Sequence, residues 1–93
     1  MHALSSRILS AAVQNGRVVV SYHLGLAEGI TLYGRRAGEP DFSELAEDQP
    51  APFIDDRPKL KPNEPEERRY RAVLLYSGEE SRLLSNEVVL TLP

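Results

Sequence analysis

Carboxylates are the first side chains in this 93-residue chain that suggest chemistry. Asp55 and Asp56 are adjacent, and Asp41 and Asp48 precede them. A calcium loop places oxygen ligands at alternating positions, and this spacing does not match it. Adjacent residues of an extended chain also point to opposite sides, so the two neighbouring aspartates do not converge on one ion. We therefore expect no metal site, and we interpret Asp56-Arg57 as a turn with a local charge pair.

A second group of charges lies between residues 64 and 71. General acid–base catalysis by a carboxylate pair requires a cleft and shifted pKa values. A solvated loop supplies neither, so we predict that these charges keep the segment soluble, with exposed pairs contributing about 0–1 kcal/mol each. The group comprises Glu64, Glu66, Glu67, Arg68, Arg69 and Arg71.

Nucleophilic catalysis finds little support in the sequence. The chain has no cysteine, which excludes a thiolate nucleophile and disulfide bonds. Ser21 and His23 are two residues apart, but no nucleophile motif surrounds them. We expect His23 to be a surface histidine. The sequence thus predicts no catalytic residue, no cofactor and no enzyme.

Composition limits the classes of partner. The net charge is −3, which argues against nucleic acid and anionic lipid, because both are bound by clustered Lys and Arg. Apolar runs are far shorter than the roughly 20 residues that span a bilayer. We expect no signal peptide in the chain as given and a single domain over residues 1–93. Six of the seven prolines lie within 40–65, and segment 39–67 carries ten acidic and three basic residues.

Alternating apolar residues predict β-strands on both sides of this acidic stretch. Asn15-Gly16 is a turn signal, and Val18, Val20 and Tyr22 after it share one strand face. Residues 42–48 are compatible with one helical turn, but we favour a short strand there. The expected strands are 6–13, 17–24, 30–36, 42–46, 58–61, 69–76 and 85–92.

Short strands with turns about every ten residues are typical of an antiparallel β-sandwich. The expected fold is therefore all-β, an antiparallel seven-stranded immunoglobulin-like sandwich. The predicted core consists of Leu9, Val18, Val20, Tyr22, Ile30, Leu32, Leu60, Tyr70, Ala72, Leu74, Val88 and Leu90, with Phe53 at its margin.

The C-terminal part resembles a known family. Residues 69–76, a Gly-containing loop and residues 84–91 resemble strands F and G of a fibronectin type III domain, in a variant found in bacterial proteins. Residues 18–22 and 30–33 would then be strands B and C, and Tyr70 would be the corner tyrosine, bonded to nearby backbone. The chain departs from the family in lacking a core tryptophan and in a longer segment before strand F. The resemblance implies a binding or spacer module without catalysis.

A partner-binding surface is the leading functional hypothesis. If strands C and F are neighbours, arginines, tyrosine and apolar residues share one outer sheet face, and interfaces favour these residue types. We predict Leu84 to cap the core and Leu83 to be free. The candidate protein interface is Tyr33, Arg35, Arg71, Val73, Leu75 and Leu83.

The leading function is thus a non-catalytic protein-interaction or spacer module. A sheet face or an edge strand would bind a protein partner or a second copy of the chain, giving a homodimer. The alternative is a carbohydrate- or metal-binding accessory domain of a larger enzyme. An independent hydrolase ranks third.

Overall fold

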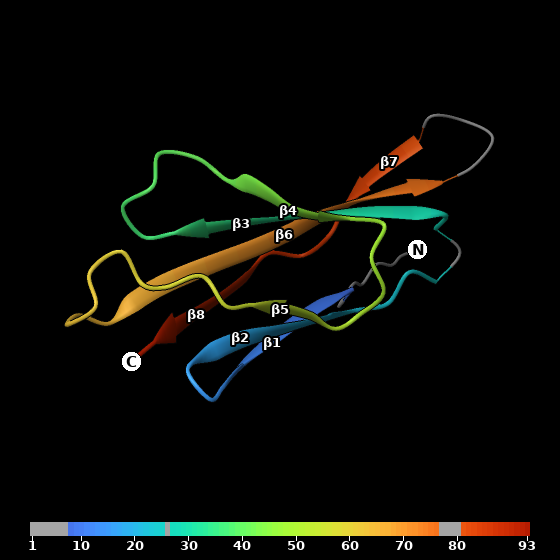
Figure 1. Cartoon of the computed structure of the whole chain (residues 1–93). Helices are drawn as coiled ribbons and strands as arrows, with labels where there is room; N and C mark the ends of the chain where they lie inside the picture. Colours follow the sequence, from blue (N-terminus) through green and yellow to red (C-terminus); the bar gives the residue numbers. More distant parts are fainter. Residues whose placement is uncertain (1–7, 26, 77–80) are drawn as a thin grey trace.

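The computed structural model describes residues 8–25, 27–76 and 81–93, and all its regular elements are β-strands. Figure 1 shows them as two layers packed against each other, which gives the molecule a sandwich-like fold. The predicted all-β architecture with antiparallel strands in two sheets is confirmed. The strands are β1 (Leu9–Gln14), β2 (Arg17–Tyr22), β3 (Gly29–Arg36), β4 (Ser43–Glu47), β5 (Phe53–Asp55), β6 (Glu66–Tyr76), β7 (Ser81–Leu84) and β8 (Val88–Leu92).

The smaller sheet has the order β1-β2-β5. Its first two strands form the hairpin that Asn15-Gly16 predicts, and both turn residues have positive φ, 54° and 78°. Strand β5 covers only three positions of β2, from Val18 opposite Asp55 to Val20 opposite Phe53. The third strand of this sheet is therefore short and has one neighbour.

The larger sheet has five strands, and its two longest elements form its centre. Strands β3 and β6 pair over eight positions, from Gly29 opposite Leu75 to Arg36 opposite Arg68. Strand β4 pairs with the outer side of β3. Strands β7 and β8 both pair with β6, one after the other along its length.

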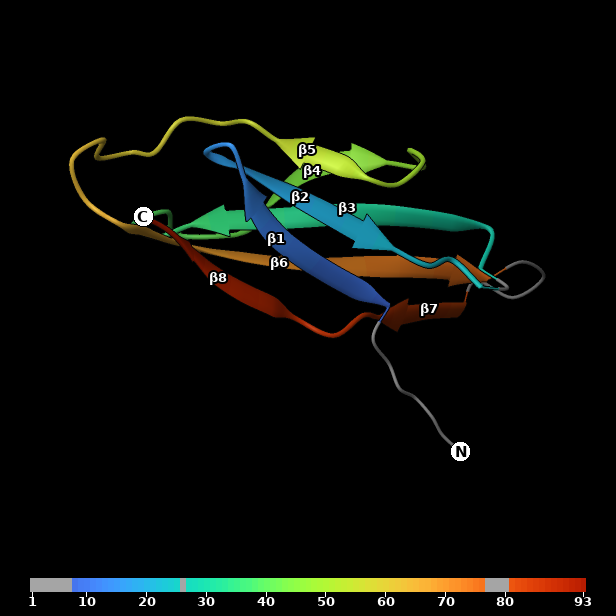
Figure 2. The same ribbon diagram turned by 90° about the horizontal axis from the view of Figure 1, so that it is seen from below.

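The expected last strand is divided at Ser85 and Asn86. The Ser85 hydroxyl accepts a hydrogen bond from the Ala72 amide at 2.9 Å, where a strand carbonyl would otherwise stand. The Asn86 side chain accepts from the Leu9 amide and donates to the Leu9 carbonyl, at 3.0 and 2.9 Å. Figure 2 shows β1 beginning beside this break. The break thus ties the edge of one sheet to the edge of the other.

Two strand predictions are wrong. Residues 58–61 form no strand, and the edge strand lies upstream at Phe53–Asp55, because Pro58 lacks the backbone donor that a ladder uses. The 85–92 strand begins at Val88 and is preceded by the separate strand β7, so the described residues form eight strands rather than seven. The helical alternative for 42–48 is also wrong, since Ser43–Glu47 is β4.

Most of the predicted core is correct. Leu9, Val18, Val20, Ile30, Leu32, Tyr70, Ala72 and Leu74 are buried, and Tyr22, Phe53, Val88 and Leu90 are partly buried. Leu60 is 47% exposed and is the one error, because it lies in a loop rather than on a strand facing inward. Ala46 and Leu92 are also buried, although the predicted core does not include them.

A charged cluster is buried between the two sheets. Asp55 of β5 and Arg68 of β6 are 1% and 0% exposed. Arg57 binds Asp55 through two nitrogens, Nε to Oδ1 at 2.9 Å and Nη2 to Oδ2 at 3.0 Å. The Tyr70 hydroxyl donates to Asp55 Oδ2 at 2.6 Å, and Arg68 Nη1 lies 3.3 Å from the same oxygen. One carboxylate of the smaller sheet is therefore held by two residues of the larger sheet.

Glu66 completes the cluster. Its Oε2 accepts from Arg68 Nε at 2.8 Å, and its Oε1 accepts from the Leu60 amide at 2.8 Å. Arg68 Nη2 donates to the Arg57 carbonyl at 2.7 Å. Two carboxylates and two guanidinium groups thus balance in charge, as burial requires. We refer to Asp55, Arg57, Glu66, Arg68 and Tyr70 as the charged clamp.

The clamp corrects three expectations. Arg57 pairs with Asp55 rather than with its neighbour Asp56. Glu66 and Arg68 are buried members of β6, so the prediction that they belong to a solvated loop is wrong. Buried and exposed side chains alternate along β6 from residue 66 onward. A hydrophobic pattern does not reveal this, because the buried residues at 66 and 68 are charged. The Tyr70 hydroxyl bonds the Asp55 side chain rather than nearby backbone.

Burial raises the pKa of Asp55, but hydrogen bonds from Arg57 and Tyr70 and the charge of Arg57 outweigh this, so the pKa is lowered overall. The pKa of Tyr70 is raised by burial and by its bond to Asp55, which keeps the hydroxyl protonated as the donor.

Gly34 provides a test of the packing around the clamp. A Cβ at Gly34 would lie 2.6 Å from Leu45 Cδ1 and 3.2 Å from both Arg57 Nη2 and Tyr70 Cδ1. We expect Gly34→Ala to lower the free energy of unfolding by about 1–3 kcal/mol in urea denaturation. Ser10→Ala, on the exposed face of β1, should change it by less than about 0.5 kcal/mol. Equal stability of the two variants would contradict the close packing described.

The lowered pKa of Asp55 predicts a pH dependence. A carboxyl group whose pKa is lower in the folded state stabilises the protein above its unfolded pKa of about 3.9. This contribution is lost as pH falls through the folded-state value. We expect the free energy of unfolding, measured by urea denaturation, to fall below about pH 4, and Asp55→Asn to make this fall shallower while lowering stability at neutral pH. Asp56→Asn, at the exposed neighbouring position, serves as the control. A parent-like slope in Asp55→Asn would refute the assignment.

Candidate interaction surface

The outward face of the five-stranded sheet carries most of the predicted interface residues. The inward residues of β6 alternate with Arg69, Arg71, Val73 and Leu75. Residues directly opposite each other in an antiparallel pair point to the same side of the sheet. Outward residues of neighbouring strands therefore form rows, and we call this side the outer face.

Three rows describe the outer face. The first joins Glu47, Thr31, Val73 and Leu84, from β4 to β7. The second joins Glu44, Tyr33 and Arg71, and the third joins Arg35, Arg69 and Val89. Leu75 lies beyond the first row, opposite Gly29. The face is thus acidic along β4 and cationic on β3 and β6 in the second and third rows. Leu84 of β7 and Val89 of β8 are apolar, and Arg82 of β7 is placed opposite Leu75.

The apolar part is open to solvent. Leu84 is 66% exposed, Val89 47% and Leu75 45%. Val73 and Tyr33 lie between them and the acidic edge, and both are partly buried. Val73, Leu75 and Leu84 occupy neighbouring positions, whereas Val89 lies two rows from Leu84. Exposed apolar residues scattered singly are ordinary on a protein surface, but a neighbouring set favours a contact surface.

The arginines of the face differ in their partners. Arg69 is paired with Glu67 and Glu87, each at 3.0 Å. The guanidinium carbon of Arg71 lies 3.9 Å from the centre of the Phe42 ring, which orients the side chain across the face. Arg35 Nε donates to the Glu39 carbonyl at 2.9 Å. Within the described residues, Arg35 and Arg71 make no ion pair.

A shallow depression lies at the acidic edge of the face. Its volume is about 180 Å³, and Glu47, Asp48, Tyr33, Val73 and Leu75 are among the residues that line it. Pockets for drug-sized ligands occupy about 300–1,000 Å³, so this depression suits one long side chain better than a small molecule.

Gly29 and Asp48 fix the wall of the depression. Asp48 has a positive φ of 55°, and its Oδ1 accepts from the Ile30 amide at 2.9 Å. A Cβ at Gly29 would lie 2.8 Å from that oxygen, so a larger residue would displace the carboxylate from this position. The Asp48 amide donates to the Ile30 carbonyl at 2.7 Å. The backbone of Ile30 therefore holds both the side chain and the amide of Asp48, which fixes this part of the acidic edge.

The structure brings five of the six predicted interface residues to this face: Tyr33, Arg35, Arg71, Val73 and Leu75. Leu83 lies opposite the buried Leu74, so it does not share the face, although it is 47% exposed. Leu84 lies opposite Val73 and points outward, so the expectation that it caps the core is wrong. The register of β7 therefore places Leu84, rather than Leu83, on the outer face.

Sequence reasoning missed the acidic edge of the face. Glu44, Glu47 and Asp48 lie in the acidic stretch, and the expected strand 42–46 does not indicate which of its residues face outward. The strand pattern around Leu45 and Ala46 indicates β4, but a register shift opposite Leu32 and Tyr33 changes which glutamates face outward. The pattern that predicts β4 is present in the sequence, but it does not show the bulge that sets which side chains face outward.

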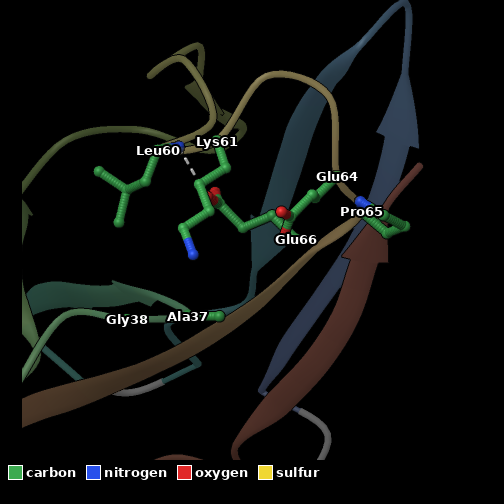
Figure 3. A pocket seen from close by; sticks show the side chains of 7 residues that line it. All are labelled: Ala37, Gly38, Leu60, Lys61, Glu64, Pro65 and Glu66. Carbon is green, nitrogen blue, oxygen red and sulfur yellow. Dashed lines mark hydrogen bonds between the residues drawn. The ribbon is translucent and has the colours of Figure 1, made fainter.

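A second, larger pocket lies beside the loop that connects β5 to β6. It has a volume of about 450 Å³ and lies between Ala37-Gly38 and the segment around Leu60, Lys61 and Glu64. Figure 3 shows the Lys61 and Glu66 side chains between the loop and the Ala37-Gly38 turn. Both oxygens of Glu66 are already bonded, to Leu60 and Arg68. This pocket therefore offers no uncommitted buried group.

The other candidate residues do not converge. His23 and Ser21 are exposed, as are Asp41 and Asp56. Across the described ranges, no group of three or more His, Asp or Glu side chains is placed to hold a metal ion. In the same ranges no helix is long and apolar enough to cross a membrane.

Comparison with protein-family models, with curated proteins and with solved structures finds no match to this chain.

Proposed function

We propose that the chain is a non-catalytic protein-interaction module of fibronectin type III-like fold, and that the outer face is its contact surface. The fold assignment is supported by the direct pairing of β3 with β6, since the resemblance requires strands C and F to be neighbours. It is further supported by the buried tyrosine of β6 and by the pairing of the last strands with β6.

The observation that carries the proposed function is the composition of the outer face. Leu75, Leu84 and Val89 are exposed beside a tyrosine and two arginines without ion pairs in the described part of the chain. Tyrosine and arginine are enriched in protein interfaces, and they contribute most where apolar neighbours exclude water. Among the described residues, the outer side of the smaller sheet has no tyrosine and only one apolar row, Ala12, Val19 and Ile54.

The module acts by shape and apolar contact, with charges setting orientation. Because the clamp and the core fix the backbone of β3 and β6, the side chains of the face are presented on a rigid support. A rigid face loses little conformational entropy on binding, which favours affinity. No chemical step is required of any residue in this account.

The absence of cysteine allows a direct test. Leu84→Cys provides a unique thiol on the outer face, and Ala12→Cys provides one on the exposed side of the smaller sheet. Each is labelled with a photoactivated crosslinker and irradiated in an extract of the native cells. We expect discrete adducts from position 84 and none from position 12, and we expect Leu75→Glu in the Leu84→Cys chain to abolish them. The same adducts from both positions, or none from either, would contradict the proposal.

A further inference from the structure

The outer face carries opposite charges in separate places. Glu44 and Glu47 lie on β4 and Asp48 follows it, at one edge of the face. Arg71 lies on β6 in the same row as Glu44, with Tyr33 of β3 between them, and Arg35 lies on β3 one row further along. Successive outward residues of a strand are about 6.8 Å apart. The two groups therefore occupy different places on one continuous surface, with Tyr33 and Val73 between them.

We propose that the occupant of the outer face is a second copy of this chain, bound face to face about a two-fold axis. This rests on the proposed function and names its partner. A two-fold axis lying in the plane of the interface brings the acidic edge of one copy over the arginines of the other, and the reverse contact follows from symmetry. A surface that carries both charge groups side by side is complementary to itself in this arrangement.

Arg71 provides the central contact. Its guanidinium is already directed across the face by Phe42, and no carboxylate of the described residues pairs with it. The depression at the acidic edge has apolar walls from Tyr33 and Val73 and two carboxylates at its rim. The aliphatic stem of an arginine fits the apolar part while its head meets the carboxylates, as long cationic side chains commonly do.

The arrangement also covers the exposed leucines. Leu75 borders the depression, and Leu84 lies in the row of Val73. Contact with a second copy removes these apolar groups from water, which favours association. The charges then set the orientation and the salt dependence of binding.

Charge reversal distinguishes this dimer from other forms of association. We expect the purified chain to sediment as a dimer at high micromolar concentration and to dissociate as salt is added. Arg71→Glu alone and Glu47→Lys alone should each weaken self-association by about tenfold or more, because each places like charges opposite one another. Arg17→Glu, an exposed reversal on β2, should leave it unchanged.

Mixing the two weakened variants is the decisive step. In a mixed dimer the acidic edge of Arg71→Glu faces the arginines of Glu47→Lys, and the new glutamate faces the new lysine. We therefore expect the mixture to form dimers at concentrations where each variant alone is monomeric. A parent chain that stays monomeric at high micromolar concentration, or a mixture that stays monomeric, would overturn the inference. If the crosslinked adducts from position 84 then contain a different protein, the proposed function survives while the second copy is rejected.

Discussion

The buried carboxylate of Asp55 is the constraint on which the arrangement of the two sheets depends. It belongs to the smaller sheet, yet it is bonded by Tyr70 and lies within ion-pair distance of Arg68, both on the central strand of the larger one. Removing Asp55 or Arg68 leaves an unbalanced charge in the interior, which costs far more than the net contribution of an exposed pair. The clamp thus fixes which part of β5 lies over β6.

The position of the outer face follows from this constraint. Because Arg68 and Tyr70 point inward, the residues between and beyond them, Arg69, Arg71 and Val73, must point outward. A slip of one residue in β6 would expose the clamp and bury the arginines of the face, at a prohibitive cost in desolvation. The residues that define the register of the core are therefore also those that define the proposed interaction surface.

Much of the fold could be predicted from alternation, and the failures have physical causes. Strands β2, β3 and the second half of β6 have apolar inward residues, so their pattern is plain in the sequence. The first half of β6 has Glu66 and Arg68 inward, and a pattern of hydrophobic residues cannot identify a strand whose buried side chains are charged. Strand β5 is three residues long and lies between prolines, so local preference gives little indication of it.

The sequence predicts the outer-face residues on β3 and β6, but not those on the neighbouring strands β4 and β7. Tyr33, Arg35, Arg71, Val73 and Leu75 follow from the alternation of two long strands that pair directly. The roles of Leu83 and Leu84 depend on the register of β7, and the outward glutamates of β4 depend on a register shift. Register is set by long-range pairing, which a single strand segment does not encode.

Native-state hydrogen exchange of β5 tests the role of the clamp most directly. A three-residue edge strand would ordinarily open locally, so that its amides exchange with a much lower free energy than those at the centre of a sheet. If Asp55 anchors the strand to the larger sheet, the β5 amides that pair with β2 should exchange only with the global unfolding seen for the middle of β6. Exchange of those β5 amides through a separate, low-energy opening while β6 remains protected would contradict the account.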